Sequence, residues 1–292
     1  MATIALIGPG AVGGVVAGWL TQRSGHTLTL CARRAGGEQT VELLTNGPVR
    51  LVANVLTDPA SAGPVDWVLV ATKAYDAAGA AAWFPALVGP ATRVAILQNG
   101  VEHRERFAPW LSAGQIVPVM VDIPAERPAP GRIVQRGPGK MIVPAGPDGA
   151  AFAALFSGTA LAVTQTADFK SAVWRKLCLN APGAINALLL KPAGVFRDEA
   201  VGRLAQAMVR ECLAVGRAEG AVLEDDLPET ILAACRAAPP DSVNSLHADR
   251  AAGRPMEIDA RNGVIVRLGR RHGIPTPYNQ MAVALLEAMA RG

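Results

Sequence analysis

An apolar run that leads directly into a cluster of glycines limits the possible folds of this chain more than any other feature. The run Thr3–Ile7 is followed by Gly8, Gly10 and Gly13, which occupy the three positions of the pattern G-x-G-x-x-G. In that pattern the first glycine allows a tight turn, the second lets the main chain approach a pyrophosphate, and the third lets a helix pack against a strand. The sequence therefore predicts a strand, a turn and a helix that bind a dinucleotide.

The residues that open the predicted helix 11–20 belong to the same loop. Unpaired N–H groups at a helix N-terminus bind phosphate, so we expect Ala11 and Val12 to bind the cofactor together with the three glycines.

The end of the second predicted strand, 27–31, indicates which dinucleotide is bound. A site for NAD usually carries Asp or Glu about 20 residues after the glycines, where the carboxylate binds the ribose hydroxyls. Here Arg33 and Arg34 follow the strand, and the nearest downstream acid is Glu38. A guanidinium pairs with the 2′-phosphate of NADP, whereas a carboxylate repels it. We therefore expect NADP(H) as the cofactor, with solvated loop arginines as the alternative.

The remaining sequence divides into a half that alternates strands with helices and a half that is helical. Further buried strands are predicted at 65–71 and 93–97, and the runs 132–135 and 140–143 are expected to extend the sheet as antiparallel strands. Helical patterns then occupy 170–190, 200–219 and 281–291. The predicted fold is α/β, with an N-terminal Rossmann-type dinucleotide-binding domain (1–166) and a C-terminal all-helical domain (167–292) for substrate binding and dimerisation.

Composition excludes several other classes of protein. Half of the 292 residues are hydrophobic and 18% are charged, which excludes a disordered chain. The basic residues are scattered and the net charge is +4, which argues against nucleic-acid binding and is compatible with a small anionic ligand. Apolar runs are shorter than a membrane span, and we expect neither a secretory signal nor a metal site. A cytoplasmic protein is the expectation.

Two places in this framework carry polar residues suited to catalysis. Lys176 and Asn180 are four residues apart on an otherwise apolar helix, so they share one face. A lysine that faces a cleft can deliver a proton, although a surface lysine that extends into solvent fits the same spacing. Asn99 follows strand 93–97, and doubly wound sheets bind ligands at the carboxyl ends of their strands.

Further motifs follow in a fixed order along nearly the whole chain. They are Thr72–Asp76, Gln98–Gly100, Trp174-x-Lys176-x-x-x-Asn180, Ser245 twelve residues before Glu257, Gly253–Asp259 and His272–Pro277. Together with the glycine loop, this order resembles the ketopantoate reductase (2-dehydropantoate 2-reductase) family. The resemblance implies a Rossmann domain joined to an all-helical domain, with the active site in the cleft between them. It also implies NADPH-dependent reduction of ketopantoate to pantoate, in pantothenate synthesis.

The resemblance assigns catalytic roles to three residues. Lys176 corresponds to the general acid of the family, and Glu257 corresponds to the carboxylate near that lysine. Asn99 corresponds to the asparagine near the nicotinamide and the substrate carbonyl. For Glu257 the alternative is a surface carboxylate paired with Arg254 or Arg261.

The resemblance assigns binding roles to four more residues. Asn180 is expected to bind the substrate hydroxyl and Ser245 the substrate carboxylate, while Lys73 and Arg33 correspond to cofactor-binding positions. Arg33 is expected near the 2′-phosphate.

One position departs from the family pattern. A second asparagine commonly follows the first by four residues, where this chain has Ala184, and the next asparagine is Asn186. Either a kink at Pro182-Gly183 brings Asn186 to the substrate, or this contact is missing. We include Asn186 among the predicted substrate-binding residues and favour a distorted helix.

Two other functions stay open at this point. A related β-hydroxyacid dehydrogenase or another 2-keto acid reductase shares the nucleotide domain and a Lys-x-x-x-Asn pair. An NADP-binding sensor without turnover belongs to a different class, and intact Lys176, Asn99 and Glu257 argue against it. The expected partners are a small 2-keto acid substrate and a second copy of the chain. The helical domain is expected to form the contact in this homodimer.

Overall fold

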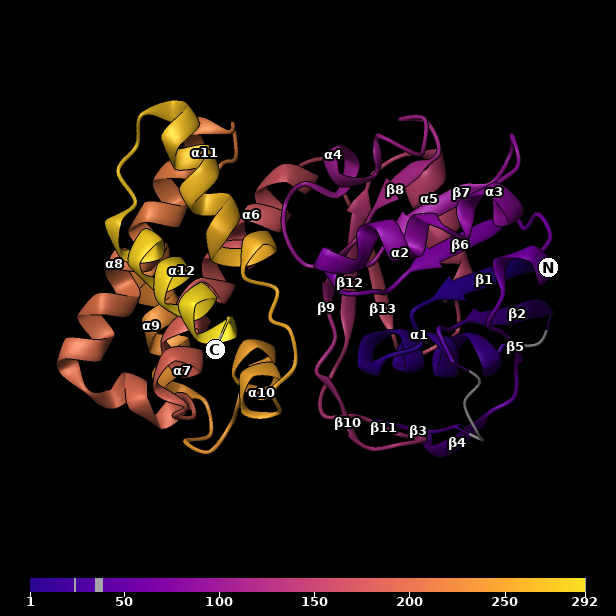
Figure 1. Ribbon diagram of the computed structural model, residues 1–292, viewed down its shortest axis with the longest axis horizontal. Coiled ribbons are helices and arrows are strands. Elements are labelled where there is room, and N and C mark those ends of the chain that lie inside the picture. Colours follow the sequence, from indigo (N-terminus) through magenta and orange to yellow (C-terminus); the bar gives the residue numbers. More distant parts are fainter. Residues whose placement is uncertain (24, 35–38, 292) are drawn as a thin grey trace. The chain divides into compact units, whose positions relative to one another are not determined.

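The computed structural model describes residues 1–23, 25–34 and 39–291, and Glu38 lies outside this described part. The chain separates into two compact units (Figure 1). The first contains residues 1–98 and 102–169, and the second contains residues 99–101 and 170–292. The turn at 99–101, and with it Asn99, belongs to the second unit.

A parallel sheet of six strands forms the centre of the first unit. Its order is β5-β2-β1-β6-β7-β8, and each neighbouring pair is parallel. The strands are β1 (Ala2–Ile7), β2 (His26–Cys31), β5 (Asn54–Leu56), β6 (Trp67–Val70), β7 (Arg93–Ile96) and β8 (Ile116–Pro118). The order reverses direction between β1 and β6, which is where doubly wound sheets bind their ligands. This arrangement confirms the predicted Rossmann-type half.

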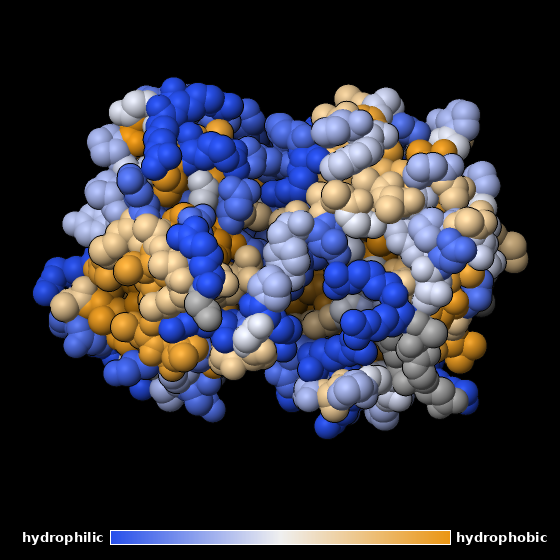
Figure 2. Space-filling view, in the orientation of Figure 1, coloured by the Kyte–Doolittle hydropathy of each residue, from blue (hydrophilic) through white to orange (hydrophobic). Residues whose placement is uncertain are grey.

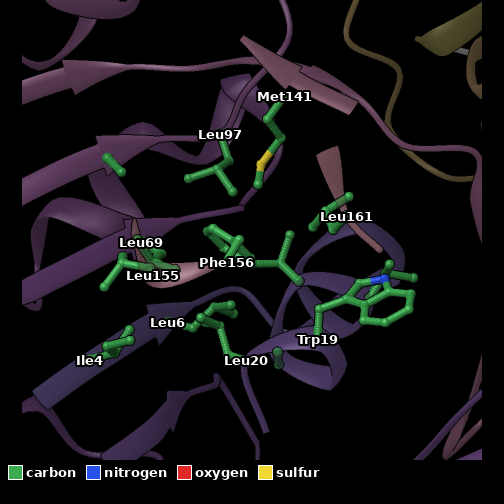
Figure 3. Packing of buried hydrophobic residues seen from close by; sticks show 14 of the residues in the cluster. Ile4, Leu6, Trp19, Leu20, Leu69, Leu97, Met141, Leu155, Phe156 and Leu161 are labelled. Atoms are coloured by element: carbon green, nitrogen blue, oxygen red, sulfur yellow. The ribbon is translucent and has the colours of Figure 1, made fainter. Parts of the chain in front are cut away.

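Side chains of the sheet alternate between two hydrophobic clusters. Ile4 and Leu6 of β1 point into a cluster that includes Trp19 and Leu20 and also Phe156 (Figure 3). The neighbouring residues of β1, such as Ala5, belong to the cluster on the opposite face. The α-helices in the described part of the unit are α1 (Ala11–Thr21), α2 (Ala77–Ala81), α3 (Phe84–Leu87), α4 (His103–Phe107) and α5 (Pro147–Leu155). Short 3-10 turns lie at Pro59–Ser61 and Ala74–Asp76. Both faces of the sheet are therefore buried, as the near-continuous apolar strands require.

Two further sheets lie beside the parallel one, and they correct one prediction. β10 (Ala125–Ala129), β11 (Arg132–Gln135), β3 (Gln39–Leu43) and β4 (Gly47–Leu51) form a four-stranded sheet. β13 (Ala162–Thr166), β12 (Lys140–Pro144) and β9 (Met120–Asp122) form a three-stranded sheet. The runs at 132–135 and 140–143 are strands, but the prediction that they extend the parallel sheet is wrong. β11 pairs with β3, and β12 pairs with β9 and β13.

The second unit is built from helices, as predicted. Its α-helices are α6 (Phe169–Asn180), α7 (Gly183–Leu189), α8 (Glu199–Ala218), α9 (Leu227–Ala237), α10 (Ser245–Ala251), α11 (Val264–His272) and α12 (Pro277–Ala290). A 3-10 helix occupies Ala193–Arg197, and a π-helical segment occupies Asp259–Gly263. Apolar residues of α7, α8, α10 and α12 pack into one cluster, which includes Ile185, Met208 and Leu286. None of the helices in the described chain is both long and apolar enough to cross a membrane.

Polar side chains fix the N-terminal ends of two of these helices. Asp198 precedes α8, and its Oδ1 accepts hydrogen bonds from the N–H groups of Ala200 and Val201. Glu211 of α8 accepts hydrogen bonds from the N–H groups of Tyr278 and Asn279 in the first turn of α12. A carboxylate at that end also complements the helix dipole. Polar contacts therefore hold α8 and α12 in register.

Candidate active site

The glycine loop after β1 has the geometry that its sequence predicts. Gly8 adopts a φ of +87°, which disfavours other residues, and a Cβ there would lie 2.7 Å from Cγ2 of Thr72. A Cβ at Gly13 would lie 2.3 Å from the carbonyl oxygen of Gly8, so the third glycine permits the close approach of α1 to the turn. A Cβ at Gly10 would have nothing within 4 Å among the described residues. The side of Gly10 that faces open space can therefore accept a ligand.

The N-terminus of α1 adds to this loop. Gly10 is the N-cap residue, and a glycine has no side-chain oxygen to accept from the first-turn N–H groups of Ala11 and Val12. A phosphate can take that place, where it also benefits from the helix dipole. The residues present therefore fit the diphosphate of a dinucleotide.

Basic side chains lie at the ends of β2 and β6 in the same unit. Arg33 follows β2, its side chain is 88% exposed, and its Nη1 lies 3.9 Å from Oδ2 of Asp76. An exposed pair at this distance contributes little, so it leaves the guanidinium able to bind a phosphate. Lys73 follows β6 and is half-buried, and its carbonyl oxygen accepts a hydrogen bond of 3.3 Å from Nε2 of Gln98. The cofactor roles of Arg33 and Lys73 stay predictions.

The predicted proton donor lies on the helix that ends at a proline. α6 ends at Asn180 because Pro182 lacks the N–H group that would continue the hydrogen-bond ladder, and α7 begins at Gly183. Lys176 and Asn180 are both half-buried and share one face of α6. The predicted distortion of this helix is therefore present.

Asn99 and Glu257 are in direct contact. Nδ2 of Asn99 donates a hydrogen bond of 3.1 Å to Oε2 of Glu257. Glu257 is 5% exposed, so the alternative of a solvent-exposed carboxylate does not apply. A buried carboxylate requires hydrogen-bond donors, and the amide of Asn99 supplies one. The contact between Glu257 and Lys176 that the resemblance implies stays a prediction.

Ser245 begins α10, next to the helix cap. Oδ1 of Asn244 accepts hydrogen bonds of 3.0 Å from the N–H groups of Leu246 and His247, which fixes the start of the helix. The serine itself is exposed, as a residue that binds substrate must be.

Two hydrogen bonds within the helical unit hold the side chain of Asn186. Its side chain is 3% exposed, its Nδ2 donates to the carbonyl oxygen of Lys191, and its Oδ1 accepts from Nδ2 of Asn244. Both bonds are 2.9 Å long. The amide therefore links α7 to the cap of α10. Each polar atom of this amide keeps one further hydrogen-bonding position, and the contact of Asn186 with substrate stays a prediction.

The sequence suggested Arg261 only as a surface partner of Glu257, but the structure buries it. Arg261 lies in the π-helical segment and is 3% exposed. Its Nη2 donates to the carbonyl oxygen of Asn180 at 2.5 Å, and its Nη1 donates to Oγ of Ser245 at 3.3 Å. Glu257 lies four residues earlier but precedes the π-helical segment, so this spacing gave no signal of the burial of Arg261.

Comparisons with known proteins identify the family. Residues 4–148 match ketopantoate reductase PanE/ApbA, and residues 168–290 match the C-terminal domain of the same family.

The chain belongs to the ketopantoate reductase family.

Full-length relatives agree with this assignment. The chain is 56% identical to the 2-dehydropantoate 2-reductase of Caulobacter vibrioides, over 99% of this chain and 100% of the relative. It is 42% identical to the 2-dehydropantoate 2-reductase of Mycobacterium tuberculosis H37Rv, over 100% of this chain and 99% of the relative. The crystal structure of a PanE/ApbA family ketopantoate reductase from Ralstonia eutropha superposes with a TM-score of 0.89 at 31% identity, over 99% and 98% of the two chains.

The family assignment confirms the resemblance and extends over both structural units. The N-terminal match lies within the unit that carries the glycine loop, apart from the turn at 99–101. The C-terminal match covers α6 to α12, and therefore Lys176, Ser245 and Glu257.

Proposed function

We propose that this member of the ketopantoate reductase family reduces ketopantoate to pantoate with NADPH. The observation that carries the proposal is the hydrogen bond between Asn99 and buried Glu257, because it joins two residues that the reaction needs. The relatives named 2-dehydropantoate 2-reductase support ketopantoate as the substrate. A cytoplasmic enzyme that acts in pantothenate synthesis follows from that reaction.

The first unit would hold the cofactor. Gly8, Gly10 and Gly13 shape the turn, and the first-turn N–H groups of Ala11 and Val12 would bind the diphosphate. Arg33 would pair with the 2′-phosphate, and Lys73 would add a second cation. Residues 1–166 would thus form the nucleotide domain of the proposal. When bound, NADPH supplies the hydride that the carbonyl carbon accepts.

Lys176 would deliver the proton in this reaction. Negative charge grows on the substrate carbonyl oxygen as the ketone becomes an alcohol, and a positioned ammonium group stabilises that charge. The same group can then transfer a proton to the oxygen, as a general acid does.

Asn99 and Glu257 would orient the carbonyl group. An amide nitrogen has two hydrogens, and the bond to Oε2 of Glu257 uses one of them and fixes the plane of the amide. Asn99 can then direct the other N–H toward the carbonyl oxygen. A nearby carboxylate also favours the charged form of the lysine, whereas burial opposes it.

The keto acid itself would be held by residues of the helical unit. Asn180 would bind its hydroxyl group and Ser245 its carboxylate, with Asn186 as a supporting residue behind Asn244. Residues 167–292 thus form the substrate and dimerisation domain of the proposal.

An apolar area on the helical unit supports a homodimer. Figure 2 shows hydrophobic side chains over α7 and α12. The large exposed side chains there are Leu189, Leu190, Met281, Leu285 and Met289. Contiguous apolar patches of this kind mark interaction surfaces. Light scattering after size-exclusion chromatography should give twice the mass of one chain, and a monomer at micromolar concentration would contradict the proposal.

Reduction of a panel of 2-keto acids tests the function. NADPH consumption is measured with ketopantoate, 2-ketoisovalerate, pyruvate and phenylglyoxylate, each at several concentrations. We expect the highest kcat/KM for ketopantoate. A preference for another 2-keto acid would make the protein a different reductase of the same fold. NADPH binding without turnover of any member would make it a sensor.

A further inference from the structure

A buried arginine connects two of the residues proposed to bind the keto acid. Arg261 donates from Nη2 to the carbonyl oxygen of Asn180 and from Nη1 to Oγ of Ser245. The guanidinium therefore joins the end of α6, the start of α10 and the π-helical segment. π-Helical turns occur frequently at functional sites.

The sequence around Pro182 explains why the guanidinium fits there. The break between α6 and α7 leaves the Asn180 carbonyl outside the helical ladder, since the N–H of Ala184 bonds to Ala181 instead. Gly183 provides the space: a Cβ at that position would lie 2.7 Å from Nη2 of Arg261. The helix break thus supplies both an acceptor and room for the arginine.

The charge of Arg261 is incompletely satisfied. Burial lowers the pKa of Arg261 to about 10, while the carboxylates of Glu257 and Asp249 act in the opposite direction, so the group is a cation at neutral pH. Its Nε is buried and has no hydrogen-bond partner among the described residues. Buried charges are costly unless they are paired. An anionic ligand close to this guanidinium would reduce that cost.

The bond from Nη1 also fixes the direction of the Ser245 hydroxyl. A guanidinium can only donate, so Oγ of Ser245 is the acceptor and keeps its own hydrogen for another partner. A carboxylate offers only acceptors, so it matches a hydroxyl that is held as a donor.

We propose that Arg261 is the positioning residue of the carboxylate subsite. It holds the Ser245 hydroxyl as a hydrogen-bond donor and supplies the positive field that favours a substrate anion. This inference rests on the proposed function, because it presumes that the ligand at Ser245 is a 2-keto acid.

The test compares charged and neutral ligands on matched variants. Arg261→Gln removes the charge. Arg250→Gln is the control, because Arg250 of α10 binds only main-chain carbonyl oxygens, of Ala187 and Leu188, in the contacts the described chain provides. Binding of pantoate and of neutral pantoyl lactone to the NADP complex is measured by calorimetry, together with kcat, KM and the melting temperature.

We expect Arg261→Gln to raise the KM for ketopantoate and the Kd for pantoate by about 10- to 100-fold, the scale of a charge-assisted contact. The kcat should change by less than about threefold, and lactone binding should stay the same. Arg261→Lys should recover part of the loss, because it restores the charge. Arg250→Gln should affect only the melting temperature. An equal loss for lactone and pantoate, or an unchanged KM, would overturn the inference.

Ser245→Ala keeps the test decisive if Arg261→Gln does not fold, since an exposed serine contributes little to the fold. Ser245→Ala should weaken the binding of pantoate and spare that of the lactone. Its combination with Arg261→Lys should lose less affinity than the sum of the losses of Ser245→Ala and Arg261→Lys alone. Equal weakening of both ligands by Ser245→Ala would contradict the inference. Wild-type turnover separates the two claims: an active wild type with an unaffected Arg261→Gln refutes only the role of Arg261. A wild type that reduces no 2-keto acid refutes both.

Discussion

The glycine loop of the first unit would present main-chain groups to the proposed cofactor, whereas the region around Glu257 in the second unit would present side chains to the proposed substrate. Around Gly10 the binding groups are N–H groups at the start of α1, and a missing Cβ leaves the space. Around Glu257 the groups are an amide, a carboxylate, a hydroxyl and a guanidinium from four separate segments. A diphosphate is common to many nucleotide cofactors, so recognition by main-chain groups suffices. A particular keto acid requires side chains that differ between proteins.

Replacement of Lys176 should have the largest effect, and it should lower turnover without affecting cofactor binding. Lys176→Ala should lower kcat at least about 100-fold, because it removes the proposed proton donor. The Kd for NADPH, measured by fluorescence titration, should change little, because the glycine loop and Arg33 belong to the other unit. Turnover within a few-fold of the wild type would show that Lys176 is not the acid.

Two glycines of one loop should respond in opposite ways to the same added methyl group. Gly13→Ala should destabilise the first unit by about 2 kcal/mol, because its Cβ would lie 2.3 Å from the Gly8 oxygen. Gly10→Ala should leave the melting temperature unchanged, since its Cβ enters only the open side of the loop. It should weaken the binding of NADPH about tenfold. If Gly10→Ala bound NADPH as the wild type does, the diphosphate would not lie there.

Acid should destabilise the first unit through His103. Burial lowers the pKa of His103 to about 4, and its Nε2 bonds to the Gln98 carbonyl, in the peptide that precedes Asn99. The unfolded chain, with a histidine pKa of about 6.5, binds a proton that the folded protein refuses between these values. The contribution to stability is therefore complete above about pH 6.5 and is lost as the pH falls toward 4.

Between pH 7 and 5 this loss should be about 2 kcal/mol in the free energy of unfolding. In denaturant titrations, the free energy of unfolding should depend less on pH for His103→Gln than for the wild type. The same slope in both proteins would assign the acid sensitivity to other groups.

A smaller effect should distinguish the two nicotinamide cofactors. Arg33→Ala combined with Arg34→Ala should weaken the binding of NADPH about tenfold and leave the binding of NADH nearly unchanged, because only NADPH carries the 2′-phosphate. Arg132→Ala is the control, since Arg132 is an exposed arginine of the same unit that pairs with Glu42. Equal wild-type affinity for NADPH and NADH would contradict the role of the arginines.

The contrast between the regions also explains which features could be predicted from the sequence. The requirements of the glycine loop are local, so Gly8, Gly10 and Gly13 specify it within six residues. The edge strand β4 escaped prediction because Gly47 and Pro48 are typical of turns, and proline is accepted only at sheet edges. The partners of β11 and β12 also could not be predicted, since strand pairing depends on contacts distant in sequence.

Arg261 escaped prediction for a similar reason. Its burial depends on the helix break at Pro182 and on the space at Gly183, which are about 80 residues away in the chain. The amide of Asn186 likewise finds its partner at Asn244, on another helix. Motifs predicted roles for Lys176, Asn99 and Glu257, whereas the contacts of Arg261 and Asn186 depend on the three-dimensional fold.

Transfer of deuterium from NADPH to ketopantoate tests the central claim most directly. The protein is supplied with NADPH deuterated at C4 of the nicotinamide, on either face in turn, and the product is analysed by mass spectrometry and NMR. We predict that one of the two forms gives pantoate with a single deuterium at C2, and that Lys176→Ala slows its appearance at least about 100-fold. Pantoate without deuterium from either form, or no pantoate at all, would contradict the account.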